Sequence, residues 1–331
     1  MGHNTENESA KPTFEAIILF KRIPYWIYWP AIGFLSFVLG ELLTRFFAEN
    51  YFLWSRLLFN VAFGTLPIIN IWFFHSFRKT MQEISIFFWQ DDAEFQRWLK
   101  NKEIHIFTLR SWMAKCVTGF IFVAGLITII LLGLPFKSEL FNLIGLICFS
   151  IFLMFCGNTL YISIGLLSTL REIVNRPTII PFFMPHHRVI SKLQNYYLIQ
   201  TLFIVLYYIG LVIAVWRGPY GLNSAMLIWL TGLASYPLVM FSWSFLQIHF
   251  LMQNIKQSYL ETINSEVQYA FKNVFNGHDF QELEHLEKIM NIQNKIHTLA
   301  EWPVSVGGAL TFLTSLATAI IQIIVSTYFR K

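Results

Sequence analysis

Hydrophobic residues along this chain gather into long runs that polar segments separate. A helix needs about 20 apolar residues to cross the hydrocarbon core of a bilayer. Runs of this kind cover 24–43, 51–74, 113–134, 140–167, 196–216, 223–247 and 303–329. The pattern therefore predicts an all-α polytopic membrane protein with six to seven spans. The fourth run is long, so we expect it to tilt or to break near Gly157 and Asn158.

The last run, 303–329, carries small and polar residues on one face. They recur at spacings of three or four, which places them along one side of an α-helix. The set is Ser305, Gly308, Thr311, Ser315, Thr318, Gln322 and Ser326, and Phe329 ends it. The opposite face is aliphatic, as at Leu313 and Ile321. In lipid, a face of small and hydroxylated residues either packs closely on another helix or lines water, and both interpretations stay open.

In the pore interpretation, several copies of this helix surround an ion pathway that the striped residues line. Gln322 lies deep in the stripe, and Phe329 closes it with a bulky apolar ring. A ring of phenyl groups forms a gate, because nothing there replaces the hydration of a passing ion. The stripe carries no charge, so we expect poor ion selectivity.

Polar segments divide the chain into parts. We expect a tail at 1–23, a transmembrane bundle at 24–247 with loops 75–112 and 168–195, a helical hairpin at 248–302, and the pore-lining helix at 303–331. The hairpin is predicted by the turn signal Asn276–Gly277 and by Asp279 with Glu282 three residues later, a capping-box pattern. Its second arm carries an apolar seam of Ile289, Ile292, Ile296 and Leu299. The hairpin either packs on itself alone or also acts as a lever on the last helix.

Charge orients these parts. The chain is 55% hydrophobic and 13% charged, far from soluble norms. The tail, the two loops and the hairpin hold 17 Lys and Arg residues, against 5 in the short segments on the other side. The positive-inside rule therefore predicts a cytoplasmic N-terminus and an outside C-terminus. Loop 75–112 is expected to include an interfacial amphipathic helix.

Two basic sets lie in the predicted cytoplasmic loops. They comprise Arg97, Lys100 and Lys102 in the first loop, and Arg188 and Lys192 in the second. The positive-inside rule explains both sets, and an anionic cytoplasmic partner is the alternative explanation.

The sequence lacks the patterns of enzymes and coupled transporters. Glu282 and His285 form a single E-x-x-H pair, whereas a di-metal bundle needs two. No P-loop, H-E-x-x-H or G-x-S-x-G pattern occurs, and no Asp or Glu lies near the middle of a span. Cys116, Cys148 and Cys156 are expected to be buried thiols. We therefore predict no catalytic residues, no metal site and no cofactor.

Residues 244–331, with their hairpin and a final span ending in Thr327-Tyr328-Phe329-Arg330-Lys331, resemble the membrane channel effectors of bacterial anti-phage systems, of the Hailong type. The resemblance implies an inner-membrane homo-oligomer of four-fold symmetry whose last helix lines the pore, with Phe329 as the gate. It also implies a soluble nucleotidyltransferase partner whose oligonucleotide product controls opening, and loss of membrane potential on opening. The alternatives are a membrane anchor or scaffold for a cytoplasmic partner, and a small-molecule permease.

Overall fold

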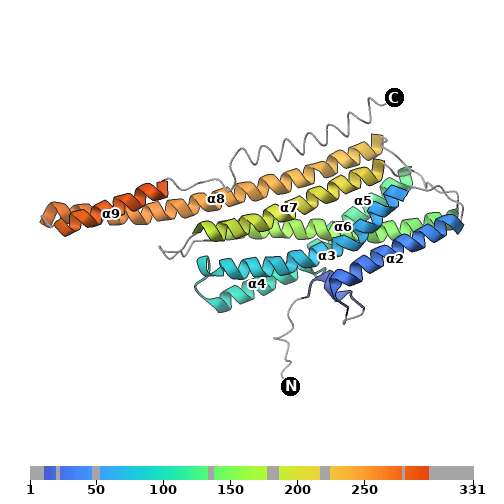
Figure 1. Cartoon of the computed structure of the whole chain (residues 1–331), viewed down its shortest axis with the longest axis horizontal. Helices are drawn as coiled ribbons and strands as arrows, with labels where there is room; N and C mark the ends of the chain where they lie inside the picture. Colours follow the sequence, from blue (N-terminus) through green and yellow to red (C-terminus); the bar gives the residue numbers. More distant parts are fainter. Residues whose placement is uncertain are drawn as a thin grey trace, which may run out of the picture. The chain divides into compact units, whose positions relative to one another are not determined.

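The computed structural model describes residues 11–19, 23–46, 53–132, 138–176, 186–216, 224–277 and 280–297. Within these ranges the chain is helical and forms no strand (Figure 1). The helices are α1 (Thr13–Ala16), α2 (Tyr25–Phe46), α3 (Leu53–Ile84), η1 (Ser85–Phe87), α4 (Asp92–Phe107), α5 (Trp112–Leu132), α6 (Glu139–Val174), α7 (His186–Trp216), α8 (Ser224–Gly277) and α9 (Phe280–His297).

Five stretches of the described chain are long and apolar enough to cross a membrane. They are Tyr25–Phe46, Arg56–Phe87, Asp92–Thr128, Asn142–Val174 and Ile190–Ala214. Each overlaps one of the first five predicted spans, so the prediction of an all-α protein with several helices long and apolar enough to span a membrane is confirmed for the described residues. The sixth predicted span falls within α8, and the seventh, 303–329, lies outside the described residues. The total of seven stays a prediction.

The chain divides into two compact units. Unit 1 comprises Met1–Thr169 and Asn195–Ser242, and unit 2 comprises Leu170–Gln194 and Trp243–Lys331. Helices α6, α7 and α8 each contribute to both units. The fourth predicted span does not break, because α6 is continuous through Gly157 and Asn158.

In unit 1, α2 and α3 approach each other through two glycines. A Cβ at Gly33 would lie 2.8 Å from the Asn60 carbonyl oxygen, and one at Gly64 would lie 3.0 Å from the Trp29 carbonyl oxygen. The first distance is shorter than real Cβ atoms show and the second is at the tight end of their range, so Gly33 above all permits this crossing. Small residues at a helix crossing are the usual basis of close packing in membranes, where lipid offers no hydrophobic driving force between helices.

The N-terminal segment is held against the bundle by α1. Phe14 of α1 is 2% exposed and packs with Trp29 and Ile71, with Phe155 beside it. The Phe14 and Phe155 rings lie edge to face with centroids 4.9 Å apart, a favoured aromatic geometry. The chain before the first span is therefore part of the folded unit from Thr13 onward.

The loop predicted at 75–112 differs from expectation in two ways. Helix α3 continues through its first part to Ile84, because the apolar pattern of the span runs on into an amphipathic one. Helix α4 is amphipathic as predicted and has Asp91 as its N-cap. Its apolar face, however, is buried within the protein, as at Phe95 and Phe107, which are each 1% exposed. The interfacial position of this helix stays a prediction.

In unit 2, α8 and α9 form an antiparallel hairpin whose turn follows Gly277 (Figure 1). The Gln293 Nε2 atom donates to Asn264 Oδ1 at 2.8 Å and joins the two arms. The predicted N-cap, Asp279, lies outside the described residues. The last predicted span, 303–329, follows this hairpin in sequence.

Candidate functional site

The predicted pore positions lie outside the described residues. They are Ser305, Gly308, Thr311, Ser315, Thr318, Gln322 and Ser326, with the gate residue Phe329. Their arrangement stays a prediction from the sequence.

The two basic sets belong to different units. Arg97 and Lys100 are exposed on α4 in unit 1, and Lys102 is half-buried there. Lys192 is exposed in the unit 2 part of α7, and the Arg188 side chain lies outside the described residues. The Arg97 Nε atom donates to the Ala93 carbonyl at 3.2 Å, a bond within its own helix. The role of both sets as contacts for an anionic partner stays a prediction.

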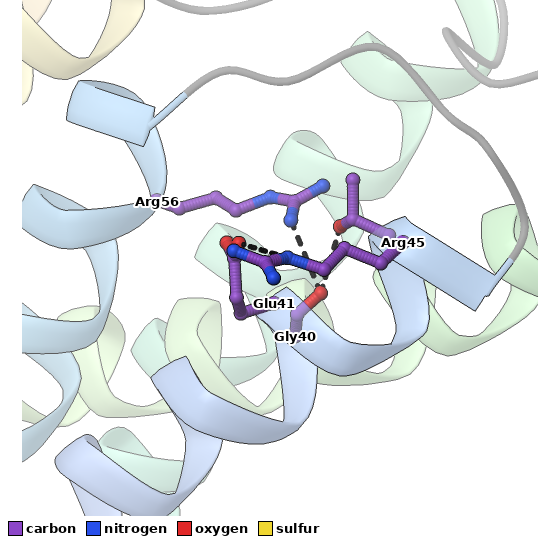
Figure 2. Close-up of polar contacts among 5 residues, drawn as sticks. Gly40, Glu41, Arg45 and Arg56 are labelled. Carbon is purple, nitrogen blue, oxygen red and sulfur yellow. Dashed lines mark hydrogen bonds and ion pairs between the residues drawn. The ribbon is translucent and has the colours of Figure 1, made fainter.

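A polar clamp joins the end of α2 to the start of α3 (Figure 2). Arg56 Nη1 donates to the Gly40 carbonyl at 3.1 Å, and the Thr44 hydroxyl donates to the same oxygen at 2.7 Å. Arg45 Nε donates to Glu41 Oε1 at 2.9 Å. Glu41 follows Gly40 along α2, so the Arg56 bond brings Glu41 and Arg56 to the same place.

A buried ion pair fastens α4 to α3. Arg78 Nε and Nη2 donate to the two carboxylate oxygens of Glu103, each at 2.6 Å. The Glu103 side chain is 2% exposed and that of Arg78 is 34% exposed. The guanidinium carbon of Arg78 also lies 5.1 Å from the centroid of the Phe74 ring. Two parallel charge-assisted bonds give this pair a fixed geometry.

The α1 segment reaches the same end of α3. Glu15 lies 3.6 Å from His75 Nε2, and it is within electrostatic range of Arg78. The Thr13 hydroxyl donates to the Phe107 carbonyl at 3.1 Å and accepts from the Leu109 amide at 3.2 Å. The pairing of α3, α4 and α1 by charge could not be read from sequence, because spacing along the chain does not say which loop charges meet.

The interior of unit 1 contains uncharged polar side chains that the sequence analysis missed. Asn70 is 1% exposed, Asn158 is 2% exposed, and Gln200 is fully buried. Both amide atoms of Asn158 and of Gln200 lack hydrogen-bond partners among the described residues, as does Asn70 Oδ1. An amide side chain in the middle of an apolar run could have pointed to them, because a polar group is costly to place in the core of a bilayer.

The chemistry available at these places is hydrogen bonding and charge pairing. Among the described residues, no group of three or more His, Cys, Asp or Glu side chains is arranged to hold a metal ion. In the exposed part of the hairpin, a hydrogen bond from Lys288 lowers the pKa of Glu284. Both side chains are more than half exposed, so this pair has little influence on stability.

No known protein family, no curated protein and no solved structure matches the chain.

Proposed function

We propose that this chain is the subunit of an oligomeric ion channel in a bacterial inner membrane, an effector that depolarises the membrane in anti-phage defence. The observation that carries the proposal is the uninterrupted stripe of small and polar residues along 303–329. A helix with one such face and one aliphatic face suits a ring of copies, with the first face toward water and the second toward protein or lipid.

The striped face would solvate ions by dipoles alone. Thr311, Ser315 and Thr318 offer hydroxyl oxygens, and Gln322 offers an amide. Conduction needs sites that bind ions weakly enough to release them, and uncharged dipoles meet that condition. A ring of Phe329 side chains would close the pathway by excluding water.

The hairpin of α8 and α9 is the proposed input element. It precedes the last helix, with α9 ending at His297 and the junction Trp302–Pro303 following. A cytoplasmic regulatory protein would act on this hairpin. By the resemblance stated above, that partner is a nucleotidyltransferase with an oligonucleotide product, and membrane lipids surround the spans.

Cysteine accessibility tests the proposal. In a chain with Cys116, Cys148 and Cys156 replaced, a cysteine is placed at Ser315 or Thr318, or at Leu313 as the control on the opposite face. We expect a small aqueous thiol reagent to modify the striped positions in the active channel and to spare Leu313. Equal modification of both faces, or of neither, would instead favour close helix packing and a scaffold function.

A small-molecule permease is the second candidate, and one observation favours it. Unit 1 buries uncharged amides at Asn70 and Gln200 inside a single protomer. A permease needs a polar path within each protomer, whereas the proposed channel needs several copies arranged around 303–329. The symmetry of the purified particle separates the two.

A further inference from the structure

Four helices of unit 1 each bring an uncharged polar side chain into the bundle interior. They are Asn70 of α3, Ser163 of α6, Gln200 of α7 and Tyr236 of α8. Ser163 and Gln200 are fully buried, and Asn70 is 1% exposed. The hydroxyl oxygen of Tyr236 is also shielded from solvent. We refer to these four side chains as the polar centre.

Contacts between α6 and α7 place Ser163 and Gln200 at one level. The Tyr197 hydroxyl donates to the Leu166 carbonyl at 2.8 Å. Gln200 lies three residues after Tyr197, and Ser163 lies three residues before Leu166. Farther along the pair, Tyr207 is within electrostatic range of Cys156, so the two helices run antiparallel. Three residues forward along α7 and three residues back along α6 therefore bring Ser163 opposite Gln200.

Helix α3 brings Asn70 to the same level. Asn70 Nδ2 donates to the Thr159 hydroxyl at 2.8 Å, and the Ser163 hydroxyl donates to the Thr159 carbonyl at 3.0 Å. On α7, Tyr196 donates to the Phe73 carbonyl at 3.3 Å.

A second contact between α3 and α7 lies on the other side of Asn70 and Gln200, where Tyr207 shares a hydrogen bond with Thr65. The first is the bond from Tyr196 to Phe73. Asn70 and Gln200 both lie between these two contacts of α3 with α7. Helix α8 completes the centre, since the Tyr236 hydroxyl lies beside Ser163 and within electrostatic range of Cys156.

The polar centre has unused hydrogen-bonding capacity. Gln200 Oε1 and Nε2 and Asn70 Oδ1 have no hydrogen-bond partner among the described residues. Leaving a buried polar group unpaired is costly, because nothing replaces the hydrogen bonds that it makes to water in the unfolded chain. Several such groups at one level therefore indicate that something else pairs with them, because a bundle interior offers no bulk water.

The chemistry of these atoms selects the ligand. Gln200 Nε2 needs an acceptor, whereas Gln200 Oε1 and Asn70 Oδ1 need donors. A cation would leave Gln200 Nε2 unpaired, and an anion would leave Gln200 Oε1 and Asn70 Oδ1 unpaired. None of the side chains that build the centre is charged, so nothing compensates an ion there. A neutral molecule that both donates and accepts hydrogen bonds satisfies all of these atoms.

We propose that the polar centre at Asn70, Ser163, Gln200 and Tyr236 binds a small uncharged molecule that both donates and accepts hydrogen bonds. Water is the smallest such molecule, and buried waters usually make about three hydrogen bonds to groups of this kind. A small amide or alcohol solute offers the same chemistry. The site is independent of the last helix, so it stands or falls apart from the proposed channel.

Radiolytic hydroxyl-radical labelling of the purified full-length protein tests this proposal. Radicals formed from bound water oxidise adjacent side chains even where bulk water does not reach. We expect Tyr236 to be oxidised in the wild type and to lose that labelling in Gln200→Leu. Thr201→Val is the matched control, because Thr201 is 2% exposed and its hydroxyl already donates to the Tyr197 carbonyl. Ser163→Ala, a smaller change, gives the same test if Gln200→Leu does not fold.

Urea at a low, non-denaturing concentration distinguishes a site for small amide or alcohol solutes from a site that holds water alone. Protection of Tyr236 in the wild type, with exposed Tyr269 as the reference for radical scavenging, would show that a solute displaces the bound molecule. Labelling that urea leaves unchanged would assign the centre to water. A wild-type Tyr236 as inert as Tyr197, or labelling that persists in both Gln200→Leu and Ser163→Ala, would overturn the proposal.

Discussion

Arg78 and Glu103 are joined by two hydrogen bonds of 2.6 Å, but their burial is unequal. Glu103 is 2% exposed, whereas Arg78 at 34% can turn toward solvent. Arg78→Met would leave a carboxylate buried without a partner and should cost about 3 kcal/mol of unfolding free energy. Glu103→Gln keeps one acceptor for a partly exposed cation and should cost only about 1 kcal/mol. Unfolding of the detergent-solubilised protein measures both.

The exposed Glu284–Lys288 pair on α9 provides the control for this comparison. Its Nζ–Oε1 distance is 2.7 Å, but both side chains are more than half exposed. Lys288→Met should therefore leave unfolding unchanged, because exposed ion pairs contribute little. An equal loss of unfolding free energy in Glu103→Gln and Arg78→Met would contradict the argument from unequal burial.

Phe329 is the residue on which the proposed gate depends. Phe329→Ala should make the channel leaky, because removal of the ring lets water and ions enter the neck. Expression alone would then depolarise cells and slow their growth. Tyr328→Ala is the control, since that side chain points about 100° away on the helix and should have much less effect. Membrane potential measured with a voltage-sensitive dye gives the result. A Phe329→Ala protein that inserts normally and leaves the potential unchanged would exclude this residue as the gate.

At the scale of elements, the helical spacing predicted for the second arm of the α8–α9 hairpin is correct, but one residue of its predicted apolar seam is not. The predicted seam placed Ile292 between Ile289 and Ile296, but Ile292 is 36% exposed, whereas Ile289 and Ile296 are each 9% exposed. The structure instead places Gln293 between them, where it bonds to Asn264 of α8. Spacings of three, four and three fit Leu286, Ile289, Gln293 and Ile296 equally well. Hydrophobicity alone selects Ile292 as the seam residue, whereas the hydrogen bond to Asn264 shows that Gln293 faces α8.

This packing predicts unequal effects for two identical substitutions. Ile289→Ala should cost about 2 kcal/mol, because it opens a cavity against α8. Ile292→Ala removes a side chain that is 36% exposed, so its effect should be smaller. Hydrogen exchange of the α9 amides measures the difference. Under the proposed function, Ile289→Ala should also weaken the response to a cytoplasmic signal. Equal loss of amide protection in the two variants would contradict the seam.

The long helices themselves could be predicted, because apolar runs of sufficient length leave few alternatives in a bilayer. The turn signal Asn276–Gly277 likewise coincides with the end of α8 at Gly277. Partners across helices could not be predicted in the same way. Neither the pairing of Arg78 with Glu103 nor the shared level of Asn70 and Gln200 leaves a periodic signal. Such contacts depend on the register between helices, which a single sequence does not contain.

At the scale of the whole molecule, apolar exposure is concentrated on the membrane-capable helices. On α2, Phe34 is 67% exposed and Leu39 is 58% exposed. Surfaces of this kind meet lipid or other protomers in a membrane protein, whereas a soluble monomer rarely has them. The α2 face that carries Gly33 is instead committed to α3. Helix α2 therefore packs on α3 with one face and exposes apolar side chains on another, as the proposed assembly in a membrane requires.

Particle symmetry of the detergent-solubilised full-length protein tests the proposed channel most directly. The account predicts a ring of copies, four by the resemblance to channel effectors, with residues 303–329 around the central axis. Single-particle imaging gives both the symmetry and the position of that helix. A monomer, or a ring in which 303–329 lies at the periphery, would contradict the proposed pore.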